Sequence, residues 1–199
     1  MKRKLPHRQQ SATKRNCGAA CLSMLYQHHR KRSNLAEITK DVAEVLPNGV
    51  PSCRNYLLIR SALAKGFSCI GVSAKNVRVF IPRCIDEGIE LIISYHPLPK
   101  PDLSGHMVLV TNADSEYVYV NDPEKSAEEG VNVPLPFDFL EENMKSRLGS
   151  SEIVRDNTIL LLKPIAKGSA VDNQTLPFSF LDDLITAEID PTTNTWIDR

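Results

Sequence analysis

The chain has 199 residues, with 24 basic and 24 acidic side chains, 42% apolar residues and five cysteines. This length and apolar content predict one compact globular domain and exclude disorder over most of the chain. A net charge of zero argues against a protein that mainly neutralises a polyanion, and no apolar run approaches the ~18 residues of a membrane span.

The chain begins with a basic arm, expected at residues 1–15, and continues into helical sequence. Asn16 is placed to cap a helix that begins at Cys17, since its side chain can accept a hydrogen bond from a free amide of the first turn. Asn34 and Glu37 form a capping-box-like start for a second helix, and Gly66 is placed to end a third. The expected helices cover residues 17–26, 35–46 and 52–65.

After Gly66 the sequence pattern favours strands. The strands are expected at residues 67–72, 89–95, 106–112, 116–121 and 158–163, with helices at 77–87 and 137–147. Residues 96–104, which contain three prolines, are expected to form a loop. Helices first and mostly antiparallel strands afterwards indicate an α+β fold with its main domain at residues 16–166.

The last segment, residues 167–199, is predicted to be an acidic C-terminal tail or a docking segment. Residues 168–199 carry six acidic side chains and one basic one, Arg199, whereas residues 1–32 carry nine basic side chains and no acidic one. No apolar stretch follows the basic beginning, so it does not resemble a secretory signal. An odd number of cysteines also argues against a fully paired secreted scaffold, so free thiols in a reducing compartment are expected.

Cys17 is the most informative residue of the sequence. At the first position of a helix, free amides and the helix dipole favour a thiolate over a thiol. Gly18 removes side-chain bulk where a substrate backbone would have to approach. The competing interpretation is a buried, inert cysteine, which is the common case in globular proteins.

A thiolate nucleophile needs a proton carrier, and the carrier needs a partner that orients it. His106 opens one expected strand, and Asp122 follows the end of the next one. If the two strands form an antiparallel hairpin, both side chains lie at the same end of the sheet. Asn112 and Asn121 are the substitutes for Asp122 if its side chain points away. Taken singly, a histidine at a strand start and an aspartate before proline are usually surface or turn residues.

Three sequence strings resemble the C39-type, papain-like cysteine peptidases. They are NCGAACLSML at residues 16–25, GHMVLV at 105–110 and YVYVNDP at 117–123. The resemblance implies a papain-like fold, in which an N-terminal helical lobe with the nucleophile helix packs on an antiparallel β-sheet. It also implies that Cys17 is the nucleophile, His106 the general acid and base, and Asp122 the orienting residue.

The family pattern further implies a glutamine that donates to the oxyanion, usually six residues before the cysteine. That position holds Ser11 here, whereas Gln10 and Gln9 lie seven and eight residues before Cys17. We assign the role to Gln10, which a one-residue bulge would present, with the Cys17 backbone amide as the second donor. Because one such donor contributes about 100–1000-fold in rate, this departure bears on activity.

The leading function is therefore a C39-like cysteine peptidase that cleaves a peptide bond through a thioester, with a peptide or protein as substrate. The same triad could serve a protein glutamine deamidase or acyltransferase of the bacterial effector or toxin type. A third option is a non-catalytic papain-fold binding module. The expected location is the cytoplasm of the producing cell, with possible export by a specialised secretion system, and the sequence leaves the oligomeric state undetermined.

The remaining candidates have ordinary structural interpretations. Cys21 lies four residues after Cys17 without a second cysteine pair, so it is expected to pack in the core rather than bind metal. His28 and His29 precede a run of basic residues without a carboxylate-rich metal spacing, and a solvated helix end is expected. No cofactor or metal is predicted. Nucleic-acid binding is not predicted either, since residues 1–25 contain no aromatic side chain on which bases could stack. Three further cysteines are expected in the core: Cys53, Cys69 and Cys84.

Overall fold

The computed structural model describes residues 4–11, 15–45, 51–97, 105–145, 155–165 and 178–199. An eight-stranded antiparallel sheet forms its centre, in the order β10-β9-β3-β8-β4-β5-β6-β7. The strands are β3 (Phe67–Ala74), β4 (Glu90–Tyr95), β5 (His106–Ala113), β6 (Tyr117–Asn121), β7 (Val133–Pro136), β8 (Thr158–Pro164), β9 (Ile185–Ile189) and β10 (Trp196–Asp198).

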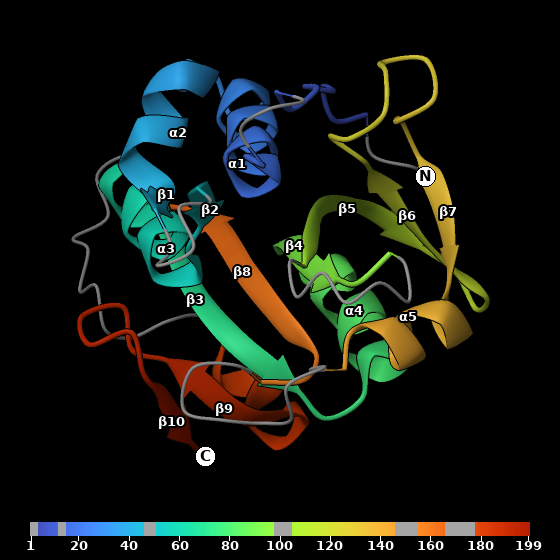
Figure 1. Ribbon diagram of the computed structural model, residues 1–199. Coiled ribbons are helices and arrows are strands. Elements are labelled where there is room, and N and C mark those ends of the chain that lie inside the picture. The colour runs from blue at the N-terminus through green and yellow to red at the C-terminus, as the bar shows by residue number, and fades with distance from the viewer. Residues whose placement is uncertain (1–3, 12–14, 46–50, 98–104, 146–154, 166–177) are drawn as a thin grey trace.

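Three helices cover one face of this sheet: α1 (Cys17–His28), α2 (Leu35–Val42) and α3 (Asn55–Ala64) (Figure 1). Every residue of α1 from Cys17 to Tyr26 is buried, which explains why this stretch is almost entirely apolar. Ile92 of β4 and Leu109 of β5 belong to the same apolar cluster as Leu22 of α1. The nucleophile-helix candidate therefore packs directly on the centre of the sheet, as expected for the helical lobe.

The opposite face is covered by α4 (Val77–Asp86), α5 (Phe137–Asn143) and the short 3-10 helix η1 (Ser179–Leu184). Side chains alternate between the two faces along each central strand, so that Leu91 and Ile93 join this second apolar cluster while Ile92 joins the first. The continuous apolar sequence of β4 follows from this burial on both sides. The α+β, papain-like arrangement predicted from the sequence is confirmed.

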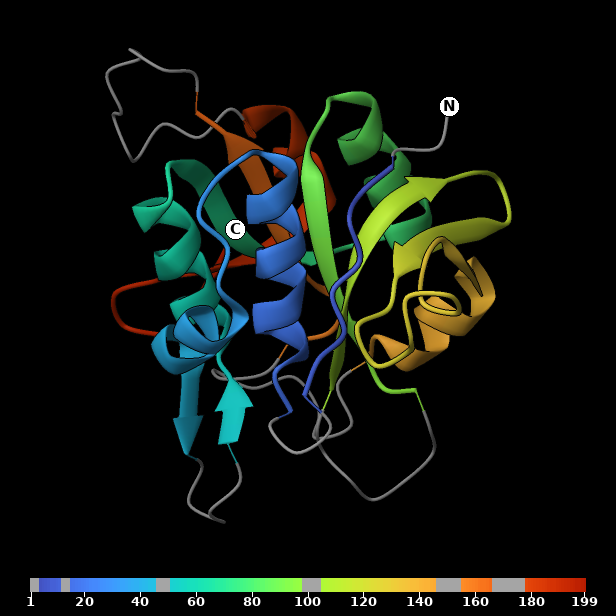
Figure 2. The ribbon, with the colours of Figure 1, turned by 90° about the horizontal axis from the view of Figure 1, so that it is seen from above.

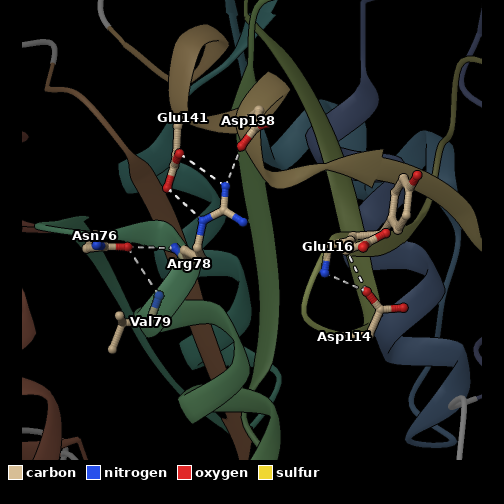
Figure 3. A network of polar contacts seen from close by, with 8 residues as sticks. Asn76, Arg78, Val79, Asp114, Glu116, Asp138 and Glu141 are labelled. Atoms are coloured by element: carbon tan, nitrogen blue, oxygen red, sulfur yellow. Dashed lines mark hydrogen bonds and ion pairs between the residues drawn. The ribbon is translucent and has the colours of Figure 1, made fainter.

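Polar contacts join α4 to α5 and close the hairpin formed by β5 and β6 (Figure 3). Arg78 of α4 donates to Asp138 and Glu141 of α5, which joins the two helices. Asp114, at the tip of the β5–β6 hairpin, accepts hydrogen bonds from the backbone amides of Glu116 and Tyr117. This aspartate turn closes the hairpin and sets the register of β5 against β6.

The structure corrects several expected boundaries. The second helix ends at Val42, and the chain then forms a two-stranded ribbon of β1 (Ala43–Val45) and β2 (Pro51–Cys53). The third helix accordingly begins at Asn55 rather than at Ser52. The strand β7 was also not expected, because its two prolines argue against a strand; it lies at the edge of the sheet, where a missing amide donor is tolerated. Of the loop expected at residues 96–104, residues 98–104 lie outside the described residues.

The C-terminal segment extends the sheet. The strand β9 pairs with β3, and β10 pairs with β9. Three of its acidic residues have basic partners, because Arg199 forms ion pairs with Asp182 and Glu188, and Arg155, which precedes β8, pairs with Asp198. The part of the tail that the structure describes thus includes a hairpin that is joined to the sheet, which the weak sequence periodicity did not reveal.

Among the helices of the described residues, we find none that has both the length and the apolar character needed to cross a membrane.

Candidate active site

The start of α1 places Cys17 at the boundary between the helical layer and the sheet. The helix begins at this residue as predicted, and the thiol is 8% exposed. The expected cap is wrong, however: the Asn16 side chain makes no capping hydrogen bond. Its Oδ1 instead accepts from the Ser11 backbone amide at 2.9 Å, and its Nδ2 donates to Thr39 Oγ1 at 2.9 Å. Asn16 therefore ties the arm before the helix to α2.

Gly18 also has a different role from the one expected. A Cβ at this position would lie 2.8 Å from Met107 Sδ and 2.9 Å from Leu58 Cδ1. The missing side chain thus allows α1 to approach β5 and α3 closely, and the space is filled by protein rather than by substrate. The close approach brings Cys17 to the strand that begins with His106.

His106 and Asp122 lie together at one end of the β5–β6 hairpin, as the sequence analysis predicted. His106 Nε2 is 2.7 Å from Asp122 Oδ1, and both side chains are buried. A carboxylate can only accept, so Nε2 is the donor, and Nδ1 is left for the interaction with Cys17 that also raises the pKa of the ring. The structure therefore brings Cys17, His106 and Asp122 into one chain of interacting side chains.

The protonation of His106 reflects this chain. Burial opposes a charge on the imidazole, but hydrogen bonds to Asp122 and Cys17 and their charges outweigh it and raise the pKa of His106 to about 10. Burial likewise opposes ionisation of Asp122, yet the hydrogen bond and charge of His106 lower the pKa of this carboxyl. The ring of Tyr95 contacts the His106 ring edge-on, with centroids 5.7 Å apart. The site thus favours an imidazolium beside a carboxylate.

The N-terminal arm is bound to the hairpin next to Asp122, and residues 4–11 run beside β6 (Figure 2). Asn121 is fully buried, and its Nδ2 donates to the carbonyl oxygens of Leu5 at 3.2 Å and Pro6 at 3.1 Å. Its Oδ1 accepts from the Asn132 amide at 3.1 Å. The ring of His7 bonds the carbonyl of Asp122 at 2.9 Å. Asn121 therefore anchors the arm and does not replace Asp122 as the partner of His106.

This anchoring fixes the main chain of Gln10 beside the site. Its backbone amide donates to the Pro123 carbonyl at 2.7 Å, one residue after Asp122. The side-chain oxygen of Gln10 is buried and has no hydrogen-bond partner among the described residues. Gln9, the other candidate, is exposed, whereas Gln10 is partly buried. Gln10 is thus the more enclosed of the two glutamines.

Comparison with known protein families gives a match that covers this site. The profile of the peptidase C39 family matches residues 4–132, which is more than half of the chain. The chain belongs to the peptidase C39 family. The matched region extends from the arm to the end of the hairpin, and it includes Gln10, Cys17, His106 and Asp122. Comparison with curated proteins gave no match.

Solved structures of other C39 peptidases share the fold. A double glycine motif protease from an AMS/PCAT transporter, determined with its leader peptide, is 20% identical, with a TM-score of 0.56 over 82% of this chain and 94% of that chain. A C39-like peptidase from Bacillus anthracis is 16% identical, with a TM-score of 0.56 over 84% of this chain and 100% of that one. The peptidase domain of Streptococcus ComA is 16% identical, with a TM-score of 0.56 over 81% of this chain and 99% of that one.

The other cysteines of this C39 family member differ from Cys17 in their surroundings. Burial raises the pKa of Cys21 and Cys69 far above the ordinary value, and it raises the pKa of Cys84 to about 12. Cys21 Sγ donates to the Met107 carbonyl at 3.6 Å and belongs to the apolar cluster between α1 and the sheet. These three thiols are held as neutral packing groups, as the sequence analysis expected.

Cys53 is placed differently from the sequence expectation. It is only partly buried, and the backbone amides of Gly18 and Ala19 at the beginning of α1 act to lower its pKa. Burial and the charge of Cys17 raise its pKa to about 11. A short strand at residues 51–53, which the sequence did not indicate, brings this thiol next to the nucleophile candidate.

Proposed function

We propose that the chain is a thiol peptidase in which Cys17, His106 and Asp122 act as a catalytic triad. The observation that carries this proposal is the buried His106–Asp122 hydrogen bond of 2.7 Å, with Cys17 buried beside the same imidazole and raising its pKa. Asp122 holds the ring by Nε2, which directs Nδ1 to the sulfur. Membership of the peptidase C39 family supports a peptide substrate for this chemistry.

The reaction follows from the protonation states of the pair. The Cys17 thiolate attacks the carbonyl carbon of the scissile peptide bond while the imidazolium of His106 holds the proton. When the tetrahedral intermediate collapses, the carbon–nitrogen bond breaks and His106 Nδ1 protonates the leaving amine. A water molecule then attacks the thioester, His106 accepts its proton, and the carboxylic acid product leaves with the thiolate restored.

Stabilisation of the oxyanion is assigned to the carboxamide of Gln10 and the backbone amide of Cys17. A carboxamide donates to an oxyanion through its NH₂ group, and of the two glutamines it is Gln10 that is partly buried beside Asp122, whereas Gln9 is exposed. The hydrogen bond from the Gln10 amide to the Pro123 carbonyl, and those from Asn121 Nδ2 to the carbonyls of Leu5 and Pro6, hold the arm close to the triad.

The substrate class is tested with a peptide panel. One structural neighbour is a double glycine motif protease bound to its leader peptide, so the panel includes leader-like peptides with a Gly-Gly pair beside peptides that lack one. Wild-type protein and a Cys17→Ala variant are incubated with each peptide, and products are identified by intact mass. We expect cleavage by wild type only, with the masses of the two products adding up to substrate plus one water.

Two results would contradict the proposal. Exchange of a side-chain NH₂ for OH in an otherwise intact substrate would show glutamine deamidation, and transfer of an acyl group to an added amine without hydrolysis would show an acyltransferase. If no peptide is cleaved, either the panel lacks the substrate or Cys17 is not an activated nucleophile. Alkylation by iodoacetamide at mildly acidic pH distinguishes these two explanations. Cys17 should react faster than Cys53 and the three buried thiols, and equal rates would exclude an activated thiolate.

A further inference from the structure

The far end of α1 carries a second group of histidine and carboxylate side chains. His28 is the last residue of the helix, and His29 is its C-cap. The sequence around them holds no carboxylate at a metal-ligand spacing. The fold supplies one from β4, where Glu90 lies 61 residues further along the chain and is within hydrogen-bond distance of His29.

The three side chains converge on one point. His29 Nε2 is 3.4 Å from Glu90 Oε1, and the centroids of the His28 and His29 rings are 4.8 Å apart. One ligand atom from each residue can be chosen so that all three lie within 4.8 Å of one another. Ligand atoms at about 2 Å from one zinc ion lie closer together than this, so the proposal requires the exposed His28 ring to move towards the other two ligands.

The burial of the group fits a site that opens to solvent on one side. The side chain of Glu90 is 6% exposed and that of His29 is 20% exposed, whereas His28 lies on the surface. The ring of Phe67 packs edge-on against His29 with centroids 5.4 Å apart and restricts its orientation. Two ligands are therefore held in place by packing, and the third closes the site from outside.

Two imidazoles and one carboxylate are a ligand set that zinc uses, with water in the remaining position. The carbonyl groups at the C-terminal end of α1 also favour a positive charge there. Lys31 opposes a cation, but its ammonium lies over the Phe67 ring, 5.3 Å from the centroid, where the ring stabilises it. The carboxylate of Glu90 adds a negative charge, which two imidazoles alone do not supply.

We propose that His28, His29 and Glu90 bind a zinc ion that fastens the C-terminal end of α1 to β4. The helix has 12 residues, so this site lies about 18 Å along the helix axis from Cys17. A zinc ion here stabilises the contact between the helix and the sheet and takes no part in the attack on substrate. The proposal does not depend on the proposed peptidase activity.

The test uses the full chain without a polyhistidine tag, in a Cys17→Ala background, because a thiolate and an imidazole at the other end of α1 would also bind zinc. Zinc chloride is titrated by isothermal calorimetry, and thermal unfolding is followed with and without zinc. Magnesium chloride serves as the hard-cation control. We expect one zinc ion per chain and a rise of a few degrees in Tm, and no effect of magnesium.

Matched variants identify the ligands. His28→Ala removes an exposed ligand and should weaken zinc binding at least about tenfold, whereas Gln27→Ala, which alters the exposed neighbour, should leave it unchanged. Glu90→Gln should weaken binding similarly, whereas Glu87→Gln, at an exposed carboxylate three residues away, should not. Unchanged zinc affinity after His28→Ala, or no zinc binding in the Cys17→Ala background, would overturn the proposal.

Discussion

The two ends of α1 hold the same kinds of side chain in opposite electrostatic states. At its N-terminal end His106 lies 2.7 Å from Asp122, and the pKa of the imidazole is raised to about 10. At its C-terminal end His29 lies 3.4 Å from Glu90, and its pKa is lowered, because burial outweighs the favourable charge of Glu90 while His28 and Lys31 add repulsion. A histidine next to a carboxylate is therefore not enough to define a catalytic pair.

The difference lies in the geometry and in the neighbours. The hydrogen bond to Asp122 is short, and Cys17 adds a second acceptor and a negative charge on the other ring nitrogen. His29 has one long contact to a carboxylate and a second histidine and a lysine as neighbours. The environment at the N-terminal end thus favours an imidazolium at His106, whereas the environment at the C-terminal end disfavours one at His29.

The largest effect on this contrast is expected from Asp122→Asn. The substitution removes the charge that helps to raise the pKa of His106 and allows the wrong ring tautomer. We expect kcat/KM to fall by about 10²–10⁴-fold and the alkaline limb of its pH profile to move to lower pH, away from about 10. The measurement is the pH dependence of peptide cleavage, with urea unfolding as a check on folding.

Activity within tenfold of wild type and an unmoved alkaline limb would show that Asp122 does not control His106. Asp122 Oδ1 also accepts from the Glu124 amide at 3.0 Å, and an asparagine oxygen can keep this contact. The loop after β6 is therefore expected to stay in place in the variant.

The next effect is expected at Gln10, the proposed oxyanion donor near the N-terminal end of α1, which has no counterpart in the proposal for the C-terminal end. Gln10→Ala should lower kcat by about 100–1000-fold with a smaller change in KM, since the lost hydrogen bond forms mainly in the transition state. Gln9→Ala is the matched control, because this neighbouring glutamine is exposed. Steady-state kinetics of both variants on the same peptide provide the measurement.

The Gln9→Ala variant shows which of the two glutamine side chains faces the active site. A large loss of kcat in Gln9→Ala and none in Gln10→Ala would show that the arm presents the other glutamine during catalysis. Equal, small effects in both variants would remove the side-chain donor from the mechanism and leave the Cys17 amide as the oxyanion donor.

The sequence predicted the catalytic candidates because their positions depend on local patterns. The apolar stretch after Asn16 predicts a buried helix. The two segments rich in strand-forming residues on either side of Asp114 predict a hairpin, so His106 and Asp122 are expected at the same end of it. The hydrogen bond between His106 and Asp122 follows from this register. By contrast, the capping role expected for Asn16 was wrong, since its side chain is used by Ser11 and Thr39, which lie in other segments.

Contacts between distant segments could not be predicted in the same way. Asn121 anchors Leu5 and Pro6, which lie more than 100 residues earlier in the chain, and no sequence pattern in the arm predicts this contact. Glu90 reaches His29 only because β4 lies under α1 in the sheet order. The strand β9 was missed because its pairing with β3 gives it a stability that its own residues do not signal.

The smallest expected effect concerns the dependence of stability on pH. The folded protein keeps the proton of His106 up to about pH 10, whereas the unfolded chain releases it near 6.5. The stabilisation from the Cys17–His106–Asp122 chain is therefore complete below about pH 6.5 and is lost as the pH rises towards 10. Wild type should lose more unfolding free energy over this range than His106→Gln, in which the glutamine cannot titrate.

Urea unfolding of both proteins near pH 6 and near pH 10 measures this difference, and groups that titrate in both proteins, such as the buried cysteines and tyrosines, cancel in it. Because Cys17 and His106 share a hydrogen bond, the difference belongs to the pair and not to the imidazole alone. Parallel losses in the two proteins would mean that the folded state does not hold this proton. The contrast with His29 would then rest on distance alone, and His106 would lack the stored charge that distinguishes the catalytic end of α1.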